Sequence, residues 1–305
     1  MISLDQFQGC LLGTALGDAL GAPFEGGILE RLLWRAIGFT KTGERRWTDD
    51  TQMTVDLVES FLAQEKIDPD DLAFRFAKSY RWSRGYGPAA AKILRKIANG
   101  VDWRLANRSV YRNGSFGNGA AMRAPILGLI FENKPDLLSE NTRLTAEITH
   151  AHPIGIEGAT LLASVTNQAA LKHNSVEILQ QLLTQSPLQE FRPQLEISLE
   201  WLKNGSQVSH LDVTRQLGNG IAAHKSCVTA IYLAFRFREQ PFLDMQHFTV
   251  RVGGDVDTIG AMAGAIWGAI NGYSSLPDNA LSKIEQREML EKLATQLHHH
   301  VSERP

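Results

Sequence analysis

The chain contains 305 residues, with 31 lysines and arginines against 33 aspartates and glutamates, so its formal net charge at pH 7 is -2. This balance supplies no overall basic field, and we expect no bulk binding to nucleic acid or to an anionic membrane. Hydrophobic residues make up 43% and charged residues 21%, which excludes disordered and collagen-like classes and is typical of a globular protein.

The cysteines and the N-terminal segment indicate an intracellular protein. Cys10 and Cys227 are too few for a disulfide framework and lack the paired spacing of a zinc site. The segment MISLDQFQGCLLG has no positive charge ahead of its apolar stretch, so we expect no signal peptide. The least polar stretch, residues 259–270, is shorter than the roughly 20 residues of a membrane-spanning helix. We therefore expect a cytoplasmic protein without a membrane partner.

Apolar residues spaced three and four apart dominate the chain, and this spacing predicts helices. The first helix is expected to begin at Ser3, where Gln6 is placed to complete a capping box. The expected helices cover residues 3–20, 50–64, 70–82, 88–99, 121–131, 141–150, 155–171, 176–185, 192–202, 221–236, 258–271 and 278–298. Only the run HFTVRV, ahead of Gly253, has the composition of a strand, and one strand cannot form a sheet.

No long Pro/Gly/Ser-rich linker and no internal repeat divides the chain, so residues 1–305 are predicted to form one domain. The predicted fold class is all-α: a single compact orthogonal helical bundle, expected to be a monomer. Residues 173–205 show no interpretable cluster and are expected to be peripheral scaffold. The adjacent histidines at 298–300 cannot share one helical face, and a frayed helix end is predicted there.

Two series of glycines recur at intervals of four residues, and each series follows one face of an expected helix. The first comprises Gly9, Gly13, Gly17 and Gly21, and the second comprises Gly260, Gly264, Gly268 and Gly272. Because a glycine inside a helix costs about 1 kcal/mol relative to alanine, a compensating gain is required. Close packing of helix backbones would supply it and would hold the adjoining loops rigidly.

Two acidic clusters stand at the starts of expected helices: W-T-D-D-T at residues 47–51 and G-G-D-V-D-T-I-G at residues 253–260. Helix capping alone explains the first cluster, but the second carries more acceptors than a cap needs. Carboxylate and hydroxyl oxygens without nearby His or Cys are the ligands that Mg²⁺ and Mn²⁺ prefer. Asp49, Asp50, Asp255 and Asp257 suffice for two such cations if the clusters meet in space, and the cations would relieve their repulsion.

Two glycine-rich segments could bind phosphate. Residues 85–87 read G-Y-G and residues 114–119 read G-S-F-G-N-G. Such segments can present backbone N–H groups to a pyrophosphate, while Phe116 or Tyr86 offers an aromatic face to a base. Ordinary turns are the alternative interpretation of both segments.

Seven motifs, in this order along the chain, resemble the motifs of a known protein family. They are G-x-x-x-G-D-A-L-G-A-P-F-E, W-T-D-D-T, G-Y-G, S-F-G-N-G-A-A-M-R, T-H-A-H-P, L-G-N-G-I-A-A and G-G-D-V-D-T-I-G. Collinear from Gly9 to Asn271, they resemble the ADP-ribosylhydrolases of the dinitrogenase-reductase-activating glycohydrolase type, most of all the serine and O-acetyl-ADP-ribose hydrolase branch. The resemblance implies an all-α bundle with a binuclear Mg²⁺ or Mn²⁺ centre, which removes ADP-ribose from proteins or small adducts.

The same resemblance implies roles for individual residues. The implied metal ligands are Thr48, Asp49, Asp50, Asp255, Asp257 and Thr258, and Glu25 is implied to be catalytic. The implied ADP-ribose-binding residues are Gly85, Gly87, Gly114, Ser115, Phe116, Gly117, Asn118 and His150. Relatives in this branch commonly carry an acidic residue where this chain has His224 and Lys225, which leaves the linkage that is cleaved open.

Our hypothesis for the reaction is hydrolysis at the anomeric carbon of the distal ribose, through a transition state with oxocarbenium character. Glu25 would protonate the leaving atom or deprotonate the attacking water, with Asp49 or Asp257 as the fallback. Two alternatives stay open: a non-catalytic ADP-ribose-binding or structural protein on the same scaffold, and a metal-dependent nucleotide phosphohydrolase. The residues decide neither the acceptor linkage nor the choice between Mg²⁺ and Mn²⁺.

Overall fold

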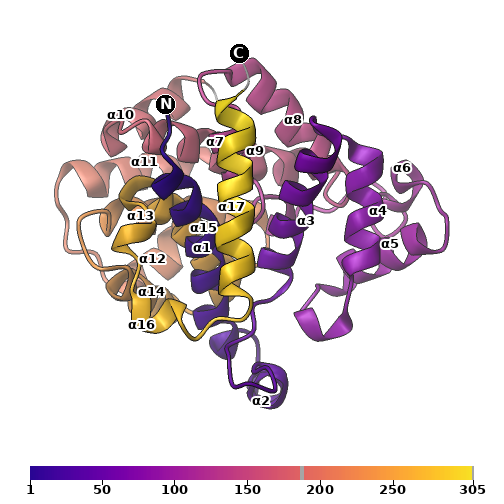
Figure 1. The fold of residues 1–305 in the computed structure, drawn as a ribbon. Helices are drawn as coiled ribbons and strands as arrows, with labels where there is room; N and C mark the ends of the chain where they lie inside the picture. Colours follow the sequence, from indigo (N-terminus) through magenta and orange to yellow (C-terminus); the bar gives the residue numbers. More distant parts are fainter. Residues whose placement is uncertain (186–188, 304–305) are drawn as a thin grey trace.

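Helices form the regular secondary structure in the computed structural model, which describes residues 1–185 and 189–303 (Figure 1). The longer helices are α1 (Leu4–Gly21), α2 (Ile28–Ile37), α3 (Asp49–Gln64), α4 (Pro69–Ser79), α5 (Pro88–Ala98), α8 (Pro135–Glu147), α9 (Pro153–Ala170), α10 (Ser175–Thr184), α11 (Arg192–Lys203), α13 (Cys227–Arg236), α14 (Phe242–Val252), α15 (Val256–Asn271) and α17 (Arg287–Ser302). The shorter ones are α6 (Trp103–Ala106), α7 (Pro125–Ile130), α12 (His210–Gln216) and α16 (Asp278–Leu281). Within the described ranges only isolated β-bridges occur and no sheet forms, so the all-α prediction is confirmed.

Helices α1 and α15 run through the centre of the bundle and are buried on nearly all sides. Helix α17 lies across α1, while α9 and α13 pack against α15 from other directions (Figure 1). Helices α3, α4 and α5 form one flank, and α10 and α11 lie on another. None of the described helices is both long enough and apolar enough to cross a membrane.

The start of α1 follows the predicted capping box. The hydroxyl of Ser3 accepts a hydrogen bond from the backbone N–H of Gln6 at 3.4 Å, and the Gln6 side chain accepts one from the Ser3 N–H at 3.0 Å. These two bonds satisfy donors that a helix start otherwise leaves unpaired. Pro23 follows the helix in a short 3₁₀ turn, Ala22–Phe24, which turns the chain toward Glu25.

Both glycine series lie between α1 and α15, so the prediction of close backbone packing is confirmed. A Cβ atom added to Gly13 would lie 2.2 Å from the carbonyl oxygen of Gly264, and one added to Gly17 would lie 2.1 Å from that of Gly260. The two helices are antiparallel, because Gly9 meets Gly268 whereas the last glycine of α1, Gly21, meets Asp257. No residue larger than glycine fits this contact without moving the helices apart.

Several boundaries differ from the sequence predictions. The run HFTVRV lies in α14, whose buried residues Met245, Thr249 and Val252 recur at helical spacing. The run therefore packs as part of a helix despite its strand propensity. Helix α8 begins at Pro135 instead of residue 141, and the helix predicted at 121–131 begins at Pro125. The helix predicted at 278–298 is divided into α16 and α17. Helices α2, α6 and α12 were missed.

Two further expectations concern segments near the chain's periphery. The predicted frayed end at residues 298–300 is wrong, because α17 continues to Ser302. His298 contacts the ring of Phe7 and His300 contacts that of Phe61, at centroid distances of 5.3 and 5.6 Å. Residues 173–205, expected to be scaffold, form α10 and α11, and residues 186–188 of that segment lie outside the described part of the chain.

The backbone contact between α1 and α15 yields a stability prediction. Gly13→Leu places a side chain into the Gly264 carbonyl, so we expect the free energy of unfolding to fall by at least about 3 kcal/mol, or the protein not to fold. Urea denaturation followed by circular dichroism measures this loss. Ala98→Leu, at an exposed position of α5, is the control. Equal midpoints for the two variants would contradict the close-packing interpretation.

Candidate active site

Three segments that are far apart in the sequence meet at one end of the α1–α15 pair. Glu25 follows α1, and Asp255 and Asp257 stand at the start of α15; each of the three offers a carboxylate oxygen within 4.8 Å of the others. The start of α3 adds Asp50, whose Oδ2 lies 3.4 Å from the Thr258 hydroxyl. The two acidic clusters recognised in the sequence therefore lie together.

Asp18, on α1, holds the start of α3 in this position. Its fully buried carboxylate accepts hydrogen bonds from the Thr48 N–H at 2.9 Å, from the Thr51 N–H at 3.1 Å and from the Thr51 hydroxyl at 2.6 Å. Thr48 is the N-cap of α3, and its hydroxyl donates to Asp50 at 2.8 Å. Asp18 thus fixes the acidic turn of α3 to the same helix that leads into Glu25.

The start of α15 is fixed by two asparagines. Gly253 and Gly254 adopt positive φ angles of 71° and 75°, which turn the chain sharply before Asp255. The Asp255 N–H donates to the carbonyl of Asn219 at 2.9 Å. The side chain of Asn118 donates to the Asp255 carboxylate at 2.5 Å and connects the glycine-rich segment to the acidic cluster.

The carboxylates of this cluster destabilise one another when ionised. Burial, followed by repulsion from Asp18 and other acids, raises the pKa of Asp49 and of Asp50 well above the ordinary value. Burial and the neighbouring Glu25 carboxylate raise the pKa of Asp257 in the same way. No lysine or arginine is among the described residues that line the pocket.

His150 packs against the glycine-rich segment and is supported from behind by Arg123. A Cβ atom added to Gly119 would lie 2.7 Å from the imidazole ring, so glycine is required for this contact. The His150 Nδ1 lies 2.8 Å from the Thr149 hydroxyl, which accepts a hydrogen bond from the buried Arg123 guanidinium at 3.0 Å. Burial and the nearby Arg123 charge lower the pKa of His150 to about 3, so the imidazole is neutral at pH 7.

The acidic clusters, Glu25, the glycine-rich segments and His150 line a pocket of about 440 Å³. Of the residues predicted for the site, the lining includes Glu25, Asp49, Asp50, Gly85, Gly87, Ser115, Phe116, Gly117, Asn118, His150, Asp255, Asp257 and Thr258. Thr48 and Gly114 are not among the lining residues; Thr48 lies behind the acids, and Gly114 turns the chain with a positive φ of 81°. Tyr111 and Ile221, which sequence reasoning missed, join Phe116 as exposed apolar side chains of the lining.

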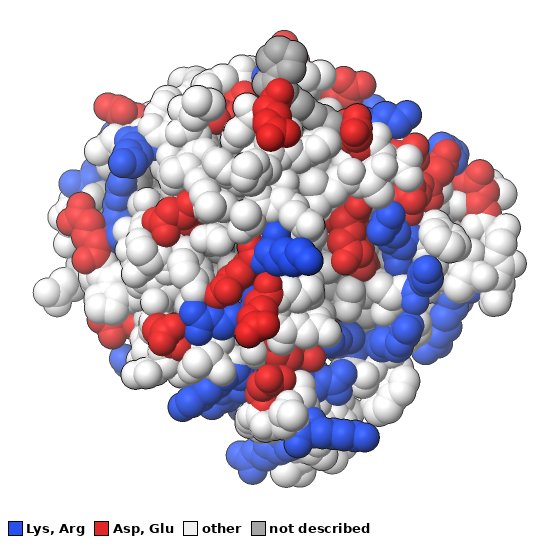
Figure 2. Space-filling view, viewed as in Figure 1, with Lys and Arg blue, Asp and Glu red and all other residues white. Residues whose placement is uncertain are grey.

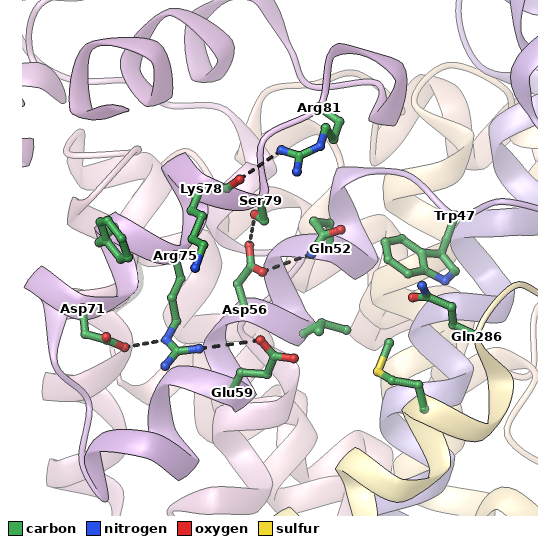
Figure 3. A pocket seen from close by; sticks show the side chains of 13 residues that line it. Trp47, Gln52, Asp56, Glu59, Asp71, Arg75, Lys78, Ser79, Arg81 and Gln286 are labelled. Atoms are coloured by element: carbon green, nitrogen blue, oxygen red, sulfur yellow. Dashed lines mark hydrogen bonds and ion pairs between the residues drawn. The ribbon is translucent and has the colours of Figure 1, made fainter. Parts of the chain in front are cut away.

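A second cavity, of about 540 Å³, lies between α3, α4 and the start of α17 (Figure 3). Its Asp56 accepts hydrogen bonds from Ser79 at 2.5 Å and from Gln52 at 3.0 Å, and burial raises its pKa to about 7. Arg75 pairs with both Asp71 and Glu59 (Figure 3). Because its acids are already bonded within the protein, this cavity is a weaker candidate for chemistry than the pocket around Glu25.

Comparison with known proteins now identifies the chain's family. The family model described as ADP-ribosylglycohydrolase matches residues 2–305. The chain belongs to the ADP-ribosylglycohydrolase family. The resemblance inferred from the seven motifs is thereby confirmed, and membership of this family makes the chain a glycosidic-bond hydrolase.

Individual ADP-ribosylglycohydrolase relatives agree over nearly the whole chain. ADP-ribosylhydrolase ARH3 of Mus musculus is 34% identical, over 97% of this chain and 92% of that protein. ARH3 of Homo sapiens is 33% identical, over 97% of this chain and 93% of that protein. A solved structure described as an ADP-ribosylglycohydrolase-related protein complex shares 27% identity and a TM-score of 0.72, and the match covers 98% of each chain.

Sequence reasoning assigned no role to two buried charged residues of this ADP-ribosylglycohydrolase site. Asp18 was visible only as part of G-D-A-L-G, where it reads as one acid in an apolar helix. Arg123 ends S-F-G-N-G-A-A-M-R, and its hydrogen bonds to backbone and hydroxyl oxygens are formed with distant segments. A charged residue in an otherwise apolar window is the signal that could have identified both, since such residues are rarely buried without partners.

The role of Asp18 yields a prediction. Asp18→Asn keeps the size of the side chain but turns an amide toward N–H donors and leaves one oxygen for three donors. We expect this loss to outweigh the relief of repulsion with Asp49 and Asp50, so that the free energy of unfolding at pH 8 falls by about 1–3 kcal/mol. Asp68→Asn is the matched control, because Asp68 caps α4 with the same kind of bond near the surface and asparagine caps equally well. Urea midpoints measure both variants. An unchanged midpoint in Asp18→Asn would show that Asp18 does not anchor α3.

Proposed function

We propose that this ADP-ribosylglycohydrolase uses two divalent cations, Mg²⁺ or Mn²⁺, to hydrolyse the bond at the anomeric carbon of the distal ribose and release ADP-ribose from a modified protein side chain or a small adduct. One observation carries the proposal: Glu25 and both acidic clusters converge at one pocket that the glycine-rich segments also line. The names of the ARH3 relatives support the same reaction class.

The residues present fit divalent cations. The donors are carboxylate and hydroxyl oxygens, the ligands that hard cations prefer. The Oδ1 atom of Asp50 is buried without a hydrogen-bond partner, and the raised pKa values of its neighbours indicate a need for positive charge. The residues that would hold the cations are Thr48, Asp49, Asp50, Asp255, Asp257 and Thr258. When bound, the cations would supply Lewis-acid polarisation and fixed positive charge for the ribose hydroxyls.

The remaining lining residues suit the ADP-ribose portion of the substrate. The glycine-rich segments around Gly85 and Gly117 line the pocket, and backbone N–H groups of these segments would bind the pyrophosphate, because no lysine or arginine is among the described lining residues. Phe116, 49% exposed at the pocket, offers its ring to a base. Neutral His150 can exchange a hydrogen bond with the substrate without adding charge.

Glu25 is the residue that would transfer the proton. It is partly exposed and lines the pocket, whereas Asp50 and Asp257 are buried beneath it. A glutamate in this position can donate a proton to the leaving atom or accept one from the attacking water, and Glu25 would perform one of these two tasks. Asp49 and Asp257 are the fallback candidates for proton transfer.

Three broader properties complete the proposal. Residues 1–305 would act as one domain, because the segments of the site come from both ends of the chain. We also propose a cytoplasmic monomer. Its substrates would be ADP-ribosylated proteins or small ADP-ribose adducts.

The proposed function is tested with a panel of defined ADP-ribosyl adducts on serine, arginine and acetate, each assayed with Mg²⁺ and with Mn²⁺. Mass spectrometry of the products separates ADP-ribose release, which we expect, from phosphate release, which a nucleotide phosphohydrolase would give. Absence of ADP-ribose from every adduct under both metals would overturn the proposal.

The proposed proton transfer predicts the effect of replacing Glu25. We expect Glu25→Gln to lower kcat at least ~100-fold, the usual contribution of a general acid or base, while the fold is retained. Glu30→Gln is the control, since this exposed glutamate lies in the first turn of α2, five residues after Glu25, and glutamine serves its capping role equally well. A kcat within a few-fold of wild type in Glu25→Gln would remove Glu25 from the mechanism.

The proposed cation site makes a separate prediction. Treatment with a chelator should abolish activity, and Mg²⁺ or Mn²⁺ should restore it. Asp257→Asn removes one buried carboxylate, so we expect metal binding, measured by titration calorimetry, and activity to be lost together. Asp244→Asn, on the exposed face of α14, should leave both unchanged. Full activity of Asp257→Asn after chelation would contradict the assignment.

A further inference from the structure

Helix α2 exposes an apolar face that the proposed function leaves unexplained. Ile28 is 79% exposed and Leu29 78%, and Leu32 and Leu33 are 51% and 50% exposed. With 3.6 residues per turn these four side chains lie on one side of the helix, while Trp34 faces the protein from the other side. Apolar residues with this spacing normally form a helix face that packs into a core, but in α2 this face is exposed to solvent.

This face lies beside the pocket. Glu25 lines the pocket, and Ile28 follows it by three residues, so their Cα atoms are at most about 11 Å apart. In Figure 1, α2 projects from the body of the molecule as a separate short helix. A group that carries the bond on which Glu25 would act would therefore pass close to the Ile28 end of this face.

Positive charge borders the same face. Arg31 and Arg35 are exposed on α2, and the described ion pairs include neither of them. Arg31 donates instead to the carbonyl of Gly26 at 3.1 Å. In Figure 2, basic side chains flank uncharged surface at the bottom of the view, and Figure 1 shows α2 in the same place. The complementary surface would combine apolar side chains with carboxylates.

The size of the face favours a transient partner. Four partly exposed side chains on a ten-residue helix present a few hundred Å² at most, whereas each partner of a stable interface buries about 800 Å². A second copy of this chain would need a much larger surface. A membrane that covered α2 would also lie close to Glu25 and would hinder the entry of a modified residue into the pocket.

From these observations we propose that the α2 face, defined by Ile28, Leu29, Leu32 and Leu33, docks the polypeptide that carries the ADP-ribosyl group, and favours segments in which apolar and acidic residues flank the modified position. The inference rests on the proposed function and assigns a polypeptide, in preference to a small adduct, as the substrate for which this surface is built. Docking on α2 contributes to binding and leaves the chemistry at Glu25 unchanged.

The test compares two substrates with the same linkage, chosen as one that the wild-type enzyme cleaves. One is the ADP-ribosylated free amino acid, and the other is a peptide in which leucines and aspartates flank that amino acid. In the double variant Leu29→Ser/Leu32→Ser we expect KM for the peptide to rise about 10-fold, with kcat retained and kinetics on the free amino acid unchanged. Arg35→Glu should also raise KM for the peptide, and added salt should weaken its effect.

The control is the double variant Leu105→Ser/Leu211→Ser. These leucines are 71% and 52% exposed, and these exposed fractions are similar to those of Leu29 and Leu32. They lie on α6 and α12, away from α2 in Figure 1. Urea midpoints confirm that all variants are folded. We expect the control to leave KM for both substrates unchanged.

Four outcomes would overturn the inference. An equal effect of Leu29→Ser/Leu32→Ser on both substrates, or none on the peptide, shows that α2 does not dock polypeptide. A wild-type dimer in analytical ultracentrifugation that this variant dissociates assigns the face to a second copy. Binding of wild type, but not of the variant, to vesicles of anionic phospholipid assigns it to a membrane. If wild type releases no ADP-ribose from any adduct, the proposed function fails and this inference fails with it, whereas the first three outcomes leave that function intact.

Discussion

The backbone contact between α1 and α15 is the constraint on which the rest of the molecule depends. Glycines spaced four apart let the two helices approach until carbonyl oxygens of one lie where side chains of the other would begin. The observed register pairs three glycines of α1 with three of α15: Gly9 with Gly268, Gly13 with Gly264 and Gly17 with Gly260. That register sets Gly21 against Asp257, and Glu25 therefore emerges beside the start of α15. The geometry of the carboxylates follows from a feature that contains no functional group.

Helix α1 also determines where the third segment lies. Asp18 binds the first turn of α3 through two N–H groups and a hydroxyl, so two acidic clusters about 200 residues apart are positioned by one helix. Gathering ionised carboxylates in this way opposes folding, as the raised pKa values of Asp49 and Asp257 show. A rigid interior of glycine and alanine can hold such a cluster together, because the helices have no alternative packing into which they could relax.

The features that could be predicted from the sequence are local patterns, whereas most of those that were missed depend on contacts between distant segments. Capping at Ser3, the glycine spacing and the two acidic clusters are local patterns, and each could be interpreted before their meeting was known. Asp18 and Arg123 act through partners brought together only by the fold, so their apolar sequence surroundings mark them as unusual but do not show which groups they bind. The run in α14 was misread as strand-like because β-branched and aromatic residues favour strands until burial at helical spacing decides otherwise.

Helix α2 was missed although its sequence, ILERLLWRAI, has the apolar spacing of an amphipathic helix; what that spacing does not show is that the apolar face points to solvent. Its apolar residues face solvent, and Gly26 and Gly27 stand between the helix and Glu25. The proposed chemistry and the proposed docking thus belong to different kinds of structure. The carboxylates lie at one end of a helix contact that admits no side chain larger than glycine, whereas the α2 face consists of large exposed residues. Under the proposed docking, substitutions on α2 would alter which polypeptide binds without disturbing the register that places Glu25.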